Sequence, residues 1–89
     1  MTREEFIDTI GARLMGRRLK IGMSRKELVQ ATGLRKQQTY NIESSVVHSH
    51  GKPVPRTSAN IIDVYAMCTA LGITLNDLVE GLPVPEVKS

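Results

Sequence analysis

Residues 22–43 read Gly-Met-Ser-Arg-Lys-Glu-Leu-Val-Gln-Ala-Thr-Gly-Leu-Arg-Lys-Gln-Gln-Thr-Tyr-Asn-Ile-Glu. Within this stretch, Ser24 and Glu27 have the Ser-x-x-Glu spacing of a capping box, which predicts that a helix begins at Ser24. Gly33 ends this helix, and a second short helix is predicted from about residue 35 to residue 43 or 44. Two short helices joined by a tight turn that contains glycine match a helix-turn-helix.

The second of these helices is predominantly polar. Leu34 precedes it and Ile42 packs late in it, whereas the other positions are mostly polar: Arg35, Lys36, Gln37, Gln38, Tyr40 and Asn41. A helix this short with so few apolar positions would be marginal alone. Lysine, arginine, glutamine and asparagine side chains can hydrogen-bond base edges in the major groove of DNA. The pattern therefore indicates that this helix contacts double-stranded DNA.

Outward from the pair, apolar residues at helical spacing predict three more helices. The first covers about residues 3–20, the fourth about 60–71, and the fifth about 74–80. In the fourth helix the predicted buried stripe comprises Ile61, Val64, Tyr65, Met67, Cys68 and Leu71. The fold class is accordingly all-α, with five helices.

Two segments lack this periodicity. Residues 45–59 contain Pro53, Pro55 and Gly51 without a helical period, which predicts a long loop between the third and fourth helices. Prolines at positions 83 and 85 exclude a helix in residues 82–89. We expect one domain over residues 1–81 and an extended or disordered tail over residues 82–89.

The positive charge of the chain is concentrated in its first half. The net charge is +3, and residues 13–36 contain eight lysines and arginines against one acidic residue, Glu27. A basic stretch beside a near-neutral remainder suggests an anionic partner such as a phosphate backbone. A solvated helix face would carry the same charges.

Other classes of function lack their sequence signals. His48 and His50 have no further ligands for a zinc site, and the single cysteine, Cys68, cannot form an intramolecular disulfide. No nucleophile elbow or glycine-rich phosphate loop is present in the sequence. We therefore expect no enzyme activity, no metal and no cofactor. Without a secretory or membrane-spanning apolar run, a cytoplasmic protein is expected.

The quoted stretch, followed by Ala-Leu-Gly-Ile-Thr-Leu-Asn-Asp-Leu at residues 70–78, resembles the phage repressor/Cro-type (XRE-like) helix-turn-helix family. The resemblance implies a five-helix lambda-repressor-like DNA-binding domain of bacterial or phage origin, in which helices two and three form the helix-turn-helix. Residues 45–59 make the loop after the third helix longer than the family usually has.

The resemblance also implies roles for individual residues. Base contacts would come from Lys36, Gln37, Tyr40 and Asn41. For the DNA backbone, the resemblance implies contacts from Arg25 and Arg35. Three further basic residues are candidates for such contacts by their charge and not by the resemblance: Arg17, and Lys52 and Arg56 of the 45–59 loop. An ion pair between Arg18 and Glu43 would join the first helix to the third. The family often dimerises through its fifth helix, so four apolar residues would either complete the core of the chain or form the contact between subunits of a homodimer: Leu75, Leu78, Val79 and Leu82.

Two positions depart from the family pattern. Arg35 stands where the family has a serine or threonine N-cap, and an arginine side chain cannot accept a hydrogen bond from the backbone. Thr39 stands where the family has a β-branched apolar residue. Either Thr39 is half-buried, or the helix is rotated so that Tyr40 packs inward.

The first hypothesis for the function is a sequence-specific transcriptional regulator, a repressor that binds a pseudo-palindromic operator as a dimer. One alternative is the antitoxin of a toxin–antitoxin pair, which would hold a protein partner through the 45–59 loop or the C-terminal tail. Another is a protein-interaction module that has lost DNA binding. A steep fall of affinity with salt would distinguish a DNA binder from the last of these.

Overall fold

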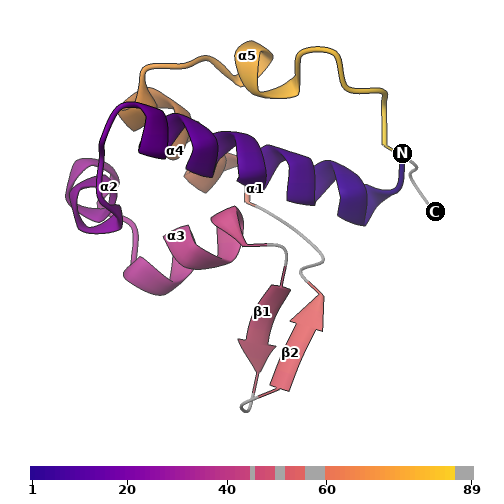
Figure 1. Cartoon of the computed structure of the whole chain (residues 1–89), viewed down its shortest axis with the longest axis horizontal. Helices are drawn as coiled ribbons and strands as arrows, with labels where there is room; N and C mark the ends of the chain where they lie inside the picture. Colours follow the sequence, from indigo (N-terminus) through magenta and orange to yellow (C-terminus); the bar gives the residue numbers. More distant parts are fainter. Residues whose placement is uncertain (45, 50–51, 56–59, 86–89) are drawn as a thin grey trace.

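Five helices and two strands follow one another in the computed structural model, which describes residues 1–44, 46–49, 52–55 and 60–85, and the strands by their backbone alone. The helices lie where the sequence predicts them, so the helical class of the fold is confirmed. Figure 1 shows the helices packed together and the two strands below them.

The longest helix, α1 (Arg3–Lys20), has a defined start and one buried side. Thr2 Oγ1 accepts a hydrogen bond from the Glu5 N–H at 3.1 Å, and Glu5 Oε1 accepts one from the Thr2 N–H at 3.0 Å. This capping box satisfies backbone donors that the first turn leaves without partners. The buried residues recur at helical spacing: Ile7, Gly11, Leu14 and Arg18.

Two short helices follow α1 in sequence. Helix α2 (Arg25–Thr32) begins with a capping box between Ser24 and Glu27, as predicted, and Gly33 ends it with a left-handed φ of 74°. The Gly33 N–H donates to the Val29 carbonyl at 2.8 Å. Helix α3 (Lys36–Glu43) begins directly after the turn and packs against α1 and α2.

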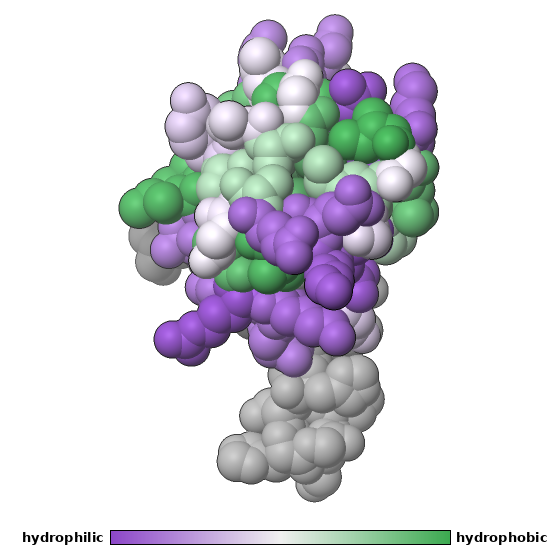
Figure 2. Space-filling model, turned by 90° about the vertical axis from the view of Figure 1, so that its left-hand side faces the viewer, coloured by the Kyte–Doolittle hydropathy of each residue, from purple (hydrophilic) through white to green (hydrophobic). Residues whose placement is uncertain are grey.

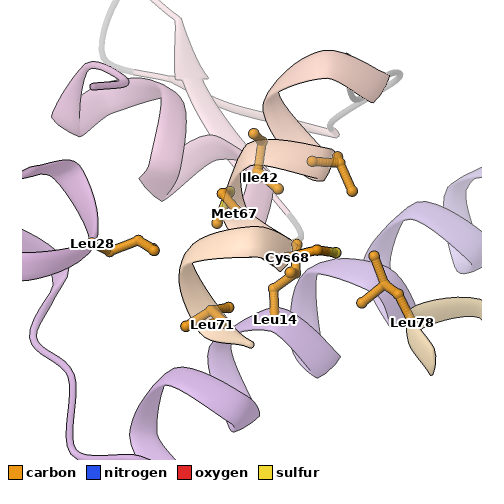
Figure 3. Close-up of a cluster of buried hydrophobic side chains, with 8 residues drawn as sticks. Leu14, Leu28, Ile42, Met67, Cys68, Leu71 and Leu78 are labelled. Atoms are coloured by element: carbon orange, nitrogen blue, oxygen red, sulfur yellow. The ribbon is translucent and has the colours of Figure 1, made fainter. Parts of the chain in front are cut away.

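Helices α4 (Ile61–Leu71) and α5 (Leu75–Val79) complete the helical part. Figure 3 shows side chains from all five helices directed toward a common centre, and the labelled residues are Leu14, Leu28, Ile42, Met67, Cys68, Leu71 and Leu78. The predicted stripe of α4 is wrong at two positions, because Ile61 and Tyr65 are exposed. Ile61 lies at the start of the helix, ahead of the buried cluster, and Tyr65 is about 100° around the helix axis from buried Val64.

The prediction of a loop over residues 45–59 is wrong where strands β1 (Val46–Ser49) and β2 (Lys52–Pro55) lie. The two strands pair antiparallel, with Val47 opposite Val54 and Ser49 opposite Lys52. Valine favours extended backbone, and proline is tolerated on an edge strand. The sequence between α3 and α4 thus forms a β-hairpin instead of irregular loop where it is described.

Two further properties concern the described part of the chain as a whole. None of its helices is both long and apolar enough to cross a membrane. Nor do its described histidine, cysteine, aspartate and glutamate residues gather in groups of three that could hold a metal ion.

Candidate nucleic-acid interface

Helix α3 has one buried and one solvent-facing side. Thr39, Ile42 and Glu43 are buried, whereas Lys36 and Gln37 are exposed. Tyr40 and Asn41, one turn after Lys36 and Gln37, are partly exposed on the same side. The four residues expected to contact bases therefore share one accessible face. Figure 2 shows hydrophilic residues gathered over the lower part of the molecule's left-hand side, where α3 lies in Figure 1.

Thr39 resolves the orientation of this helix. Its side chain is fully buried, and its Oγ1 donates to the Lys36 carbonyl at 2.8 Å. The hydroxyl is thus satisfied within the helix while its methyl group faces the protein interior. Tyr40 remains on the outer side, so of the two orientations that the sequence left open, the one with Thr39 inward is observed.

Glu43 ties α3 to both α1 and α2. Its Oε2 lies 2.8 Å from Arg18 Nε, and its Oε1 lies 2.9 Å from Arg25 Nη2. The Glu43 side chain is 0% exposed and that of Arg18 is 8% exposed. Arg18 Nη1 also donates to the Met23 carbonyl at 2.9 Å, in the segment between α1 and α2. The ion pair that the resemblance implied is present, with a second arginine added to it.

Arg25 connects the buried ion pair with the solvent-facing side. Its guanidinium lies over the Tyr40 ring, 5.2 Å from the ring centroid, within the range of a cation–π interaction. The sequence suggested only a phosphate contact for Arg25, and no spacing pattern signals that it pairs with Glu43. The structure places it as a bridge from Glu43 to Tyr40.

A shallow depression of about 430 Å³ opens between the start of α2 and the outer side of α3. Arg25, Lys36, Gln37 and Tyr40 line it. The depression combines two cationic side chains, an amide and an aromatic ring. The two cationic side chains of this surface can bind an anionic oxygen of a ligand, while the Tyr40 ring contacts a flat aromatic group of the same ligand.

The outer amides of α3 are held in relation to each other. Gln37 Nε2 donates to Asn41 Oδ1 at 2.9 Å, across one turn of the helix. Glutamine and asparagine amides can each present both a donor and an acceptor to an adenine edge. The bond between them reduces the number of orientations that the Gln37 amide can adopt before it meets a ligand.

The start of α3 is capped by Gln38 instead of Arg35. Gln38 Oε1 accepts a hydrogen bond from the Arg35 N–H at 3.0 Å. Gln38 Nε2 donates to Asp63 Oδ2 in α4 at 3.3 Å. This role of Gln38 was not predicted, although a glutamine at the third helical position is the second half of a capping box. Arg35 is left exposed at the entrance of the helix.

Of the three remaining predicted backbone contacts, the structure describes the side chain of Arg17 alone. Arg17 Nε donates to the Leu71 carbonyl at 3.0 Å and so serves the C-terminal end of α4. Lys52 belongs to β2 by its backbone, but its side chain lies outside the described part. Arg56 also lies outside the described residues. Within the described side chains, α3 is therefore accompanied at this surface by Arg25 and Arg35.

Of the two roles left open for the residues in and after α5, Leu78 takes the role in the core. This residue is 1% exposed and belongs to the core of its own chain. Leu75 is partly buried and packs against the same core, and Leu82 is half-buried, whereas Val79 is exposed.

Comparisons with models of known protein families, with curated proteins and with solved structures each found no match to this chain.

Proposed function

We propose that the chain is a sequence-specific, double-stranded DNA-binding transcriptional regulator of the phage-repressor type. Helices α2 and α3 would act as its helix-turn-helix, with α3 in the major groove and the start of α2 near the phosphate backbone. A repressor that occupies an operator and blocks access to a promoter is the simplest regulator of this kind.

One observation carries the proposal: α3 is fixed on its inner side and polar on its outer side. Buried Thr39 and the ion pairs of Glu43 hold the helix against α1 and α2. Base recognition requires donors and acceptors that are held in position before DNA arrives. Every surface helix has a polar outer side, so what favours DNA here is that Arg25 and Lys36 lie beside Gln37 and Tyr40 on that side.

The outer residues would divide the work between bases and phosphates. Lys36, Gln37, Tyr40 and Asn41 would face the base edges. Arg35 and Arg25 would contact phosphates on either side of the groove. The bonds from Arg25 to Glu43 use Nε and Nη2, so Nη1 is the atom that we assign to the phosphate. Lys52 and Arg56 remain proposed backbone contacts, whereas Arg17, bound to the end of α4, is left out.

The test begins with selection of bound duplexes from random DNA, followed by fluorescence-anisotropy titration of the selected site. Gln37→Ala should weaken binding to that site by about 1–3 kcal/mol and relax the preference at one base position. Asn76→Ala is the matched control, because it removes an exposed amide from α5. This control should leave the affinity unchanged.

Three outcomes would count against the proposal. If no duplex sequence is enriched, the chain is not a sequence-specific DNA binder. If Gln37→Ala weakens all sequences equally, the assigned base contact is wrong. If the affinity for DNA hardly changes between low and high salt, phosphate contacts do not drive the binding, since counterion release makes such affinities fall steeply with salt.

A further inference from the structure

The pairing of the hairpin sorts its backbone groups into two sets. In β1 and β2, Val46 lies opposite Pro55, Val47 opposite Val54, His48 opposite Pro53, and Ser49 opposite Lys52. In an antiparallel ladder, opposed residues alternate between pairs that exchange N–H···O bonds and pairs whose N–H and C=O groups point away from the partner strand. One alternate set therefore bonds inside the hairpin and the other faces its outer edges.

The prolines show which pairs exchange hydrogen bonds inside the hairpin and which pairs direct their backbone groups outward. Pro53 and Pro55 lack an N–H and cannot exchange bonds with β1. The bonding pairs are thus Val47 with Val54 and Ser49 with Lys52, and the outward positions are Val46 and His48 on β1 and the two prolines on β2. The outer edge of β2 presents carbonyls without donors. The outer edge of β1 presents both donors and acceptors.

The outer edge of β1 is open within the described structure. There the sheet contains β1 and β2 alone, and Figure 1 shows the hairpin below the helices. An edge with unpaired N–H and C=O groups is a template for another strand, and an isolated two-stranded hairpin is only marginally stable in water. Blocking of β2 by proline directs any such pairing to β1.

We propose that β1 pairs antiparallel with β1 of a second copy of this chain, around a two-fold axis at Val47. Val46 would then exchange hydrogen bonds with His48 of the second copy, and His48 with Val46 of the second copy. An antiparallel edge is complementary to itself under two-fold rotation, which gives a closed dimer. The prolines on both outer strands of the joined sheet prevent further addition.

This dimer surface differs from the one that the family resemblance implies at α5, where Leu78 belongs to the core of its own chain. It does not depend on DNA binding, so either proposal can fail alone. It also has a geometric consequence for α3, because α3 ends at Glu43 and β1 begins at Val46. Two-fold pairing of β1 would set the two α3 helices symmetrically about the same axis.

The first experiment compares His48→Pro with His48→Ala by sedimentation equilibrium of the full chain. Both variants lose the imidazole, but only proline removes the outward N–H. Wild type and His48→Ala should sediment at twice the 9.8 kDa mass of the chain, and His48→Pro should shift toward the monomer. Circular dichroism melting of all three proteins checks that each is folded.

Two results of this experiment would overturn the proposal. One is a wild-type protein that stays monomeric over the whole concentration range. A monomer whose β1 edge binds an extended segment of another protein, and not a second copy, counts as the same result. The other is a His48→Pro variant that dimerises as strongly as His48→Ala, since the dimer would then be formed elsewhere.

A second experiment tests the register without relying on proline. The two-fold axis places Val47 opposite Val47 of the second copy in a non-hydrogen-bonded pair, with Cα atoms about 4.5 Å apart. That separation lies within the range that a disulfide spans. Val47→Cys should therefore form a covalent dimer under mild oxidation, whereas the control Val54→Cys on β2 should not.

The native cysteine does not confuse this assay. Cys68 is fully buried, and burial, with a smaller effect of Asp77, raises the pKa of its thiol. The thiolate is the reactive form, so Cys68 should stay unmodified while the protein is folded. Equal cross-linking of Val47→Cys and Val54→Cys, or of neither, would contradict the proposed pairing.

Discussion

Glu43 shows how one residue can control the position of a whole helix. Its carboxylate is shielded from solvent, accepts hydrogen bonds from Arg18 on both oxygens, and accepts hydrogen bonds from Arg25 on Oε1. The pairing with Arg18 follows from the family resemblance. The pairing with Arg25 could not be predicted, because the resemblance placed Arg25 at the DNA backbone and only the packed structure shows which way its side chain turns.

We predict that removing Arg18 and removing Arg25 lower the free energy of unfolding by different amounts. Arg18→Ala should lower the free energy of unfolding by about 3–5 kcal/mol, because it leaves a buried carboxylate without its buried partner. Arg25→Ala should cost less, since its side chain is 29% exposed and Arg18 remains in place. Urea denaturation followed by circular dichroism measures both values.

The double replacement Arg18→Met with Glu43→Leu is the control. Replacing both members of a buried pair with apolar residues of similar volume is often close to neutral. We expect it to recover much of the loss caused by Arg18→Ala. Equal losses for Arg18→Ala and Arg25→Ala would contradict the account of the buried pair.

Two substitutions of Tyr40 distinguish the contribution of its ring to stability from the contribution of its hydroxyl to DNA binding. Tyr40→Phe keeps the ring beneath Arg25 and should leave the free energy of unfolding nearly unchanged. Tyr40→Ala should lower it, in part by the loss of a cation–π contact that contributes roughly 0.5–1 kcal/mol at exposed sites. A DNA affinity that falls for Tyr40→Phe then reports on the hydroxyl alone. If Tyr40→Phe destabilises the fold as much as Tyr40→Ala, the ring contact has been misassigned.

At the scale of elements, helix boundaries were the most predictable feature. Ser24, Glu27 and Gly33 mark the ends of α2 through local chemistry, without reference to the rest of the molecule. The hairpin was missed because Pro53 and Pro55 interrupt the pattern of a strand, and only the register shows that both occupy outward positions. The exposed Ile61 and Tyr65 of α4 were misassigned because periodicity does not show where the core ends.

The capping boxes make stability depend on pH. The Ser24 N–H donates to the Glu27 carboxylate, and this bond, followed by the interaction with the Ser24 hydroxyl, holds the pKa of Glu27 below its ordinary value. Glu5 and Asp77 are lowered in the same way by Thr2 and Thr74. Because folding lowers the pKa of these carboxylates, the unfolded chain takes up protons at a higher pH than the folded chain does. The free energy of unfolding therefore falls as the pH decreases through the range in which carboxylates titrate.

We therefore expect Glu27→Ala to be less stable than wild type near neutral pH, with a difference that shrinks as the pH falls below the ordinary pKa of glutamate. Thermal melting at a series of pH values measures it. Glu4→Ala is the matched control, an exposed glutamate in the first turn of α1 outside the capping box. A Glu27→Ala deficit that stays constant down to acid pH would contradict the assigned bond.

If the prolines of β2 prevent strand pairing at its outer edge, their removal should permit further association. Replacing Pro53 and Pro55 together with valine restores outward N–H groups on β2 and so opens a second edge. We expect the variant to form assemblies larger than those of the wild type, measured by light scattering. An unchanged mass would show that proline at these positions does not limit association.

At the scale of the whole molecule, the order of the five helices followed from the sequence, because each buries a stripe of apolar residues in one shared core. The spatial relation between that core and the hairpin did not follow from it. The candidate interface could be predicted in part from the sequence. The identity of the outer residues of α3 came from the sequence, whereas their anchoring through Thr39, Gln38 and Arg25 came from the structure.

We propose that the outer face of α3 binds DNA, and a nitrogen–proton NMR titration with the selected duplex can locate the bound face. We expect the largest changes in chemical shift at the side-chain amides of Gln37 and Asn41 and at the backbone amides of α3, with no change at Asn76 in α5. Shifts centred on α4 or α5, with α3 unaffected, would contradict it.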